Sequence, residues 1–231
     1  MNNIITRLCA IVIATHLEEL TTSLQKASPN ADLVELRLDF IPNIKPSDLN
    51  QIRDLCKLPT IITCRAKAHG GQFTGSIQQQ FEILQQDNAL GFEFIDIDLS
   101  IAKDIVFDKQ HSKRILSFHN FEKTPNLATL ESIKKEMHDN QADIMKFATY
   151  ANSMADSKTL LKFLLNKAPE EKMIVLGMGN AGRMTRILSP LLGGYLTFIN
   201  AHNPEAAVGS ISGTALNEIF DKVKYFIENK D

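Results

Sequence analysis

The sequence has no apolar run that approaches 18 residues, no Cys-x-x-Cys pair and almost no net charge, and each absence excludes a class of protein. Without such a run, no transmembrane helix is expected. The 25 Lys and Arg residues nearly balance 27 Asp and Glu residues, so nothing indicates an electrostatic nucleic-acid binder. The three cysteines are odd in number and unevenly spaced, which disfavours a disulfide framework and a zinc site. We therefore expect a reduced, cytoplasmic protein that binds neither membrane nor nucleic acid.

Short apolar runs recur along the chain, roughly 27 residues apart, close to the ~30 residues of a strand with its helix. The eight runs begin at Leu8, Leu33, Thr60, Phe92, Arg114, Asp143, Lys172 and Tyr195. Most are dense in Ile, Val, Leu and Phe and bounded by turn residues, as strands buried on both faces are. Each is followed by a helix-like stretch, for example one with Leu17, Leu20 and Leu24 in a single stripe. This alternation predicts a parallel sheet covered by helices.

No Pro- or Gly-rich linker divides the 231 residues, and eight units at this length favour an α/β fold, a single-domain (β/α)8 TIM barrel over residues 1–231. The alternative is an open doubly wound sheet, whose dinucleotide-binding form has Gly-x-Gly-x-x-Gly after its first strand. Here the pattern comes after the seventh predicted strand, at Gly177, Gly179 and Gly182. In a barrel, the loops after strands seven and eight often hold an anion, so we interpret this loop as an anion cradle.

Charged side chains occur in or directly after the predicted strands, where barrel active sites form. The second strand alternates apolar residues with charged ones, among them Glu35 and Arg37. An internal Glu35–Arg37 ion pair is one explanation, and recognition of a substrate carboxylate and hydroxyl is the other. Arg65 follows the third strand, and Arg183 and Arg186 follow the glycine-rich loop. These arginines are candidate anion ligands.

Lys146 and His119 are the candidate catalytic residues. Lys146 lies within the apolar sixth strand, where an unpaired ammonium would cost several kcal/mol. Either a neighbouring acid pairs with it, or burial lowers its pKa and leaves a neutral amine that attacks a ketone to form a Schiff base. His119 ends the fifth strand, where a histidine can act as acid or base near neutral pH.

Five motifs occur in order between about residues 8 and 220: Glu35-Leu36-Arg37-Leu38-Asp39, Cys64-Arg65 with Gly70-Gly71, Ser117-Phe118-His119-Asn120-Phe121, Lys146-Phe147-Ala148, and Gly177 to Arg186. Together they resemble type I 3-dehydroquinate dehydratase. The resemblance implies a (β/α)8 barrel that dehydrates 3-dehydroquinate in the shikimate pathway through a lysine imine, with no metal or cofactor. It assigns the imine to Lys146 and proton transfer to His119. It assigns substrate binding to Glu35, Arg37, Arg65, Arg186 and Ser210, with the carboxylate held by Arg186. We also expect a homodimer.

The sequence departs from that family at several positions. The family has a Glu, the partner of the catalytic histidine, where this chain has His69, and an acid where it has Asn120. Two polar side chains of the family's lid loop correspond to Ala206 and Ser210. The short segment before the first predicted strand implies a shortened N-terminal head. From these departures we expect a slow dehydratase.

Two other functions are compatible with the same residues. A class I aldolase-like lyase would use Lys146 on another small keto acid, and a non-catalytic descendant would bind a carboxylate without turnover. Borohydride converts an imine into a stable secondary amine, so trapping separates both lyases from the binding protein. Absorbance of the conjugated product separates the dehydratase from the aldolase-like lyase.

Overall fold

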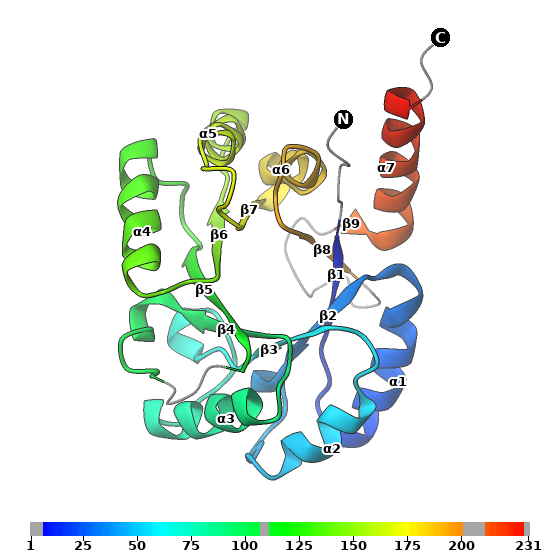
Figure 1. The fold of residues 1–231 in the computed structure, drawn as a ribbon, viewed down its shortest axis with the longest axis vertical. Helices are drawn as coiled ribbons and strands as arrows, with labels where there is room; N and C mark the ends of the chain where they lie inside the picture. The colour runs from blue at the N-terminus through cyan, green and yellow to red at the C-terminus, as the bar shows by residue number, and fades with distance from the viewer. Residues whose placement is uncertain (1–6, 107–110, 201–210, 229–231) are drawn as a thin grey trace.

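The computed structural model describes residues 7–106, 111–200 and 211–228, which form a curled parallel sheet inside a ring of helices (Figure 1). The strands are β1 (Leu8–Val12), β2 (Leu33–Arg37), β3 (Thr60–Thr63), β4 (Phe94–Asp98), β5 (Lys113–Asn120), β6 (Ile144–Tyr150), β7 (Met173–Met178), β8 (Thr197–Asn200) and β9 (Ile211–Ser212). Strands β1 to β8 each overlap one of the eight predicted runs, and the two-residue β9 is the one strand among the described residues that was not predicted.

The sheet curls so that β7 contacts the segment just before β8. The hydrogen-bonded order is β7-β6-β5-β4-β3-β2-β1-β8-β9, so β8 pairs with β1. Just before β8, the Tyr195 backbone N–H donates to the carbonyl oxygen of Met173, the first residue of β7, at 2.7 Å. This hydrogen bond joins the β7 side of the sheet to the β8 side. The predicted fold class, an α/β barrel of the TIM type, is therefore confirmed.

The helices are α1 (Leu17–Ala27), α2 (Asp48–Leu55), α3 (Ile77–Ala89), α4 (Leu127–Asp139), α5 (Met154–Leu165), α6 (Gly179–Leu191) and α7 (Gly213–Glu228). Their apolar stripes face the sheet, as Leu20 and Leu24 do in α1. The expectation of a helix after every strand is wrong between β4 and β5. There the described residues form one 3₁₀ turn, Leu99–Ile101, because this connection is the shortest between successive strands from β1 to β8.

Side chains inside the barrel are arranged in layers, because residues two apart on a strand point to the same face. An apolar layer fills the amino-terminal end of the barrel and consists mainly of Leu33, Ile61, Phe94, Ile115, Ile144 and Ile174. Two residues further along five of those strands, the inward positions are Glu35, Thr63, Asp96, Ser117 and Lys146, all of them buried. The barrel therefore has an apolar floor beneath a buried polar layer, and the site is built on that layer.

Candidate active site

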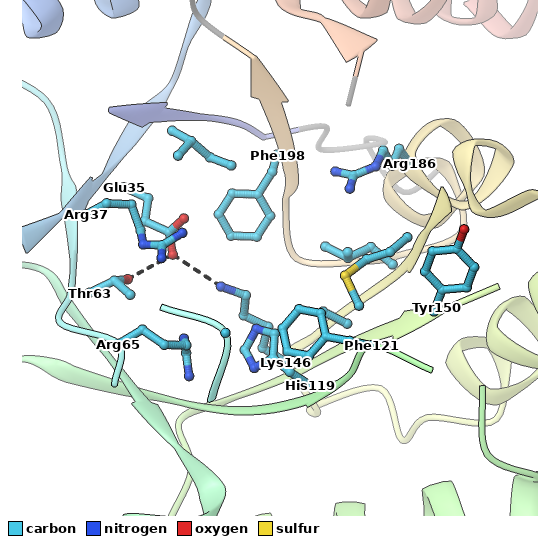
Figure 2. Close-up of a pocket in the computed structure, with 15 residues that line it drawn as sticks. Glu35, Arg37, Thr63, Arg65, His119, Phe121, Lys146, Tyr150, Arg186 and Phe198 are labelled. Carbon is cyan, nitrogen blue, oxygen red and sulfur yellow. Dashed lines mark hydrogen bonds and ion pairs between the residues drawn. The ribbon is translucent and has the colours of Figure 1, made fainter. Parts of the chain in front are cut away.

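A cavity of about 410 Å³ opens above the polar layer at the carboxyl ends of the strands (Figure 2). Six predicted site residues line it: Glu35, Arg37, Arg65, His119, Lys146 and Arg186. Ser210, the seventh, lies outside the described residues, as do Ala206 and the expected N-terminal head over residues 1–6. Strands β2, β3, β5 and β6 and helix α6 thus bring side chains from distant parts of the chain into one cavity.

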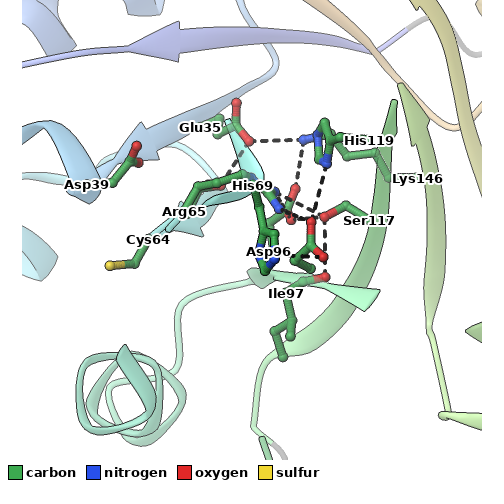
Figure 3. A network of polar contacts seen from close by, with 12 residues as sticks. Glu35, Asp39, Cys64, Arg65, His69, Asp96, Ile97, Ser117, His119 and Lys146 are labelled. Carbon is green, nitrogen blue, oxygen red and sulfur yellow. Dashed lines mark hydrogen bonds and ion pairs between the residues drawn. The ribbon is translucent and has the colours of Figure 1, made fainter. Parts of the chain in front are cut away.

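Lys146 extends from β6 toward two carboxylates (Figures 2 and 3). Its Nζ lies 2.7 Å from Asp96 Oδ2, 3.2 Å from Glu35 Oε1 and 4.5 Å from the centroid of the Phe198 ring. Burial lowers the pKa of Lys146, but the charges of Asp96 and Glu35 outweigh burial and hold the pKa above its ordinary value. Of the two alternatives, pairing of Lys146 with a neighbouring acid is the one that the structure shows, and the neutral amine produced by burial is wrong. The lysine must give up a proton before it can attack a ketone.

Glu35 and Arg37 do not pair with each other, because each has different partners. The alternative of an internal Glu35–Arg37 ion pair is therefore wrong. In the described part of the chain, Glu35 Oε1 accepts from Thr63 Oγ1 at 2.8 Å and from Lys146 Nζ. Arg37 donates Nε and Nη2 to the two carboxylate oxygens of Asp39, at 2.9 and 2.7 Å. This bidentate pair orients the guanidinium at the edge of the cavity.

Asp96 on β4 is a functional candidate that the sequence reasoning missed. Its side chain is fully buried and accepts from Lys146 Nζ, from Arg65 Nη2 and from Ser117 Oγ (Figure 3). Burial raises the pKa of Asp96, but the charges of Arg65 and Lys146 lower it well below its ordinary range, so the carboxylate is ionised. The signal was present in the sequence, since Asp96 and Asp98 alternate with apolar residues as Glu35 and Arg37 do.

Arg65 lines the cavity, yet its terminal nitrogens contact neighbouring strands. Nη2 donates to Asp96 Oδ1 and lies 3.0 Å from Ser117 Oγ, and Nη1 donates to Asp98 Oδ2 at 3.0 Å. Arg65 thereby holds two acids of β4 in place. A direct contact of Arg65 with substrate stays a prediction.

His119 forms part of the cavity wall, and the Phe121 ring stacks on its imidazole with the centroids 6.0 Å apart. Burial and the nearby charge of Arg65 lower the pKa of His119 to about 4, so the ring is neutral near pH 7 and can accept a proton. Gly70 leaves room for this stack. A Cβ at Gly70 would lie 2.2 Å from Phe121 Cζ, and the backbone φ of +81° is one that glycine readily adopts.

The glycine-rich segment joins β7 to α6 and carries Arg186 to the cavity. A Cβ at Gly182 would lie 2.3 Å from the carbonyl carbon of Gly177, so both glycines are needed where the helix packs against the strand. Arg186 is 1% exposed and points into the cavity (Figure 2). Arg183, on the same helix, is exposed. Burial and the charge of Arg183 lower the pKa of Arg186 to about 10, so it remains cationic near pH 7. The anion cradle stays a prediction, with Arg186 as its cation.

The family model described as type I 3-dehydroquinase matches residues 8–225. The chain belongs to the type I 3-dehydroquinase family. The 3-dehydroquinate dehydratase of Coxiella burnetii (strain CbuK_Q154) is 41% identical to it over 216 residues, which cover 94% of this chain and 93% of the relative. That of Methanococcus vannielii is 34% identical over 224 residues, 94% of this chain and 100% of the relative. The solved 3-dehydroquinate dehydratase of Geobacillus kaustophilus HTA426 has the same fold, with a TM-score of 0.85 at 21% identity over 96% of this chain and 92% of that one.

Two residues at which this type I 3-dehydroquinase departs from its family, Asn120 and His69, lie within the described part of the chain, and their contacts are visible. Asn120 Oδ1 accepts from the backbone N–H groups of Glu122 and Lys123, at 3.0 and 2.9 Å, and so caps the turn after β5. His69 ends a short 3₁₀ turn and lies 3.2 Å from Ser100 Oγ through its Nε2. Over the described ranges, no group of three His, Cys, Asp or Glu side chains is placed to hold a metal ion. Within the same ranges, no helix has the length and hydropathy to span a membrane.

Proposed function

We propose that this type I 3-dehydroquinase dehydrates 3-dehydroquinate to 3-dehydroshikimate, a step of the shikimate pathway, through an imine on Lys146. The observation that carries the proposal is the position of Lys146 Nζ, in contact with two carboxylates in a cavity that also contains a neutral histidine and a buried arginine. A lysine, a base and an anion ligand are the groups that dehydration of a hydroxy keto acid requires.

Arg186 binds the substrate carboxylate. Its guanidinium is buried at the cavity wall, where a charge-assisted hydrogen bond to a carboxylate is stronger than in water. Glu35 and Arg37, on the β2 side, supply an acceptor and a donor for substrate hydroxyls. The substrate is thereby oriented with its ketone toward Lys146.

Imine formation begins with loss of a proton from the Lys146 ammonium to one of the carboxylates that it contacts, Asp96 or Glu35. The neutral amine then attacks the C3 ketone, and the resulting carbinolamine loses water to give the iminium. The positive nitrogen withdraws electrons from C3 and makes the neighbouring C2 proton acidic.

His119 accepts the C2 proton, and the electron pair of that C–H bond forms the C1–C2 double bond as the C1–O bond breaks. His119 then gives the proton to the departing hydroxyl, which leaves as water. Hydrolysis of the imine releases 3-dehydroshikimate and returns Lys146. No net proton is consumed, so a single histidine suffices for both transfers.

Borohydride reduction in the presence of 3-dehydroquinate tests the imine. We expect a covalent adduct on Lys146 by mass spectrometry, and conjugated product by absorbance without borohydride. Lys146→Ala removes the amine and abolishes both signals. Lys172→Ala, which removes an exposed lysine just before β7, is the matched control and retains both. An adduct that persists in Lys146→Ala contradicts the assignment.

The same experiment separates the other two functions. An adduct without conjugated product would indicate a class I aldolase-like lyase on another keto acid. Neither adduct nor product would indicate a carboxylate-binding descendant. The slow rate, the homodimer and the cytoplasmic location stay predictions from the sequence.

A further inference from the structure

A second cavity, of about 370 Å³, shares the rings of His119 and Phe121 with the substrate cavity. These two rings therefore separate the cavities. The second cavity is lined by polar side chains of the segments after β3 and β4, namely His69, Asp98 and Ser100, and by Glu136 of α4. None of these four residues lines the substrate cavity.

The carboxylate of Asp98 lies between the two histidines. Its Oδ2 is 3.6 Å from His119 Nδ1 and accepts from Arg65 Nη1 at 3.0 Å. Its Oδ1 accepts from Ser100 Oγ at 2.6 Å and lies 3.8 Å from His69 Nδ1. Each oxygen thus faces one histidine. Burial raises the pKa of Asp98, but its contacts with His119 and Ser100 lower it to about 2, so it is ionised at neutral pH.

This placement determines which nitrogen of His119 acts on substrate. A neutral imidazole has a single N–H, and a carboxylate beside Nδ1 favours the form with the hydrogen there. Nε2 then keeps its lone pair and is the nitrogen able to accept a proton. When the ring becomes an imidazolium, the same carboxylate compensates its charge.

His69 contacts the far side of the same group. Its Nε2 lies 3.2 Å from Ser100 Oγ, and that hydroxyl donates to Asp98 Oδ1. The backbone N–H of Ser100 donates to the same oxygen at 3.1 Å. Ser100 and His69 therefore orient the Asp98 carboxylate from the side opposite His119.

We propose that Asp98 is the positioning carboxylate of His119, held in orientation through its other oxygen by Ser100 and His69. The inference rests on the proposed function, since it concerns proton transfer by His119 in the dehydration. Asp98 acts through His119 and does not line the substrate cavity.

Asp98→Asn keeps the shape of the side chain and removes its charge. We expect kcat to fall by roughly 10²-fold, a large part of what general acid–base catalysis contributes. KM for 3-dehydroquinate should change little, and the borohydride adduct on Lys146 should still form. Glu136→Gln, which removes a charge from the wall of the same second cavity, is the matched control and should keep wild-type kcat.

A double variant separates positioning from a general structural effect. If Asp98 acts through His119, Asp98→Asn adds little further loss of kcat in a His119→Ala background. Losses that multiply would overturn the inference. Ser100→Ala is the milder variant, which removes one hydrogen bond from the far oxygen and should lower kcat by about tenfold or less.

The pH dependence of kcat/KM separates the two roles, because a purely structural role of Asp98 would leave it unchanged. The charged and titratable groups that surround His119 are Asp98, Arg65, Lys146 and Asp96, with His69 and Glu136 across the second cavity. Asp98 raises the pKa of His119 against burial and the cations, so the acid limb of kcat/KM should move to lower pH in Asp98→Asn. In Asp98→Glu, which keeps the charge, the limb should stay nearer its wild-type position.

Different results would contradict the positioning role of Asp98 and the proposed dehydratase function. Wild-type kcat in Asp98→Asn, with adduct and product both formed, overturns the positioning role and leaves the dehydratase intact. Absence of adduct and product in the wild-type protein overturns the proposed function itself.

Discussion

Two buried cations at the centre of the barrel share one acid. Lys146 and Arg65 both contact Asp96, and Lys146 also contacts Glu35. Because an uncompensated buried charge costs several kcal/mol, this sharing keeps each cation in the polar layer. It also supplies the oxygens to which the Lys146 ammonium can release its proton. At the residue scale, one set of contacts therefore serves both stability and reactivity.

The two arginines of α6 should differ sharply when each is changed to lysine. Lysine cannot make the bidentate contact of a guanidinium with a carboxylate. A charge-assisted hydrogen bond is worth about 1.5–3 kcal/mol, or about 10- to 150-fold in binding. We expect Arg186→Lys to raise KM for 3-dehydroquinate by at least about tenfold.

Arg183→Lys is the control for that measurement, since Arg183 is exposed and lies on the same helix. Its KM should remain within about twofold of the wild-type value, because surface changes usually have small effects. A larger effect at Arg183 than at Arg186 would show that the carboxylate is bound by the exposed residue.

At the scale of elements, the junction of β7 and α6 links packing to binding. Gly182→Ala places a Cβ against the backbone of Gly177, so the helix must move away from the strand. Overpacking of this kind typically costs about 1–3 kcal/mol of unfolding free energy. The same movement displaces Arg186, so KM should rise together with the loss of stability. Urea unfolding and steady-state kinetics measure the two effects.

Asn180→Ala is the matched control, because Asn180 is exposed and lies two residues before Gly182 on the same helix. Its unfolding free energy should stay within about 0.5 kcal/mol of wild type. Equal stability of the two variants would mean that the close approach of α6 to β7 is not needed.

At the scale of the whole molecule, one buried carboxyl opposes folding as the pH rises. Asp87 on α3 is fully buried, and neither oxygen has a hydrogen-bond partner within the described residues. Burial raises its pKa well above the ordinary value. Above about pH 4 the unfolded chain releases this proton while the folded chain keeps it. The contribution of Asp87 to stability is therefore present below about pH 4 and is lost as the pH rises toward the folded pKa.

Asp87→Asn should be more stable than the wild-type protein at pH 7. Because burial raises the pKa of Asp87, we expect Asp87→Asn to gain more stability over the wild-type protein at pH 7 than at pH 4. Urea unfolding at both pH values measures this. The control is Asp54→Asn at an exposed aspartate, which should show no such difference. Equal stability of wild type and Asp87→Asn at pH 7 contradicts a protonated Asp87.

The sequence by itself determined the eight barrel strands, most of the helices and six of the residues that line the cavity. Strand and helix patterns are local, since burial on both faces or on one stripe is visible within a dozen residues. Once the alternation of strands and helices predicts a barrel, polar residues at strand ends must meet at one mouth. That rule placed Glu35, Arg65 and Lys146 together without any knowledge of their contacts.

Only the tertiary structure decided which side chains pair with each other and which charge each of them carries. Lys146 and Glu35 are 111 residues apart in the chain, and only the curvature and register of the sheet bring them to 3.2 Å. The direction of the Lys146 pKa shift depends on those carboxylates, because burial and ion pairing act in opposite directions and their balance depends on distance. The burial of Arg186 beside exposed Arg183 likewise depends on how α6 packs on β7, where two glycines permit a close approach.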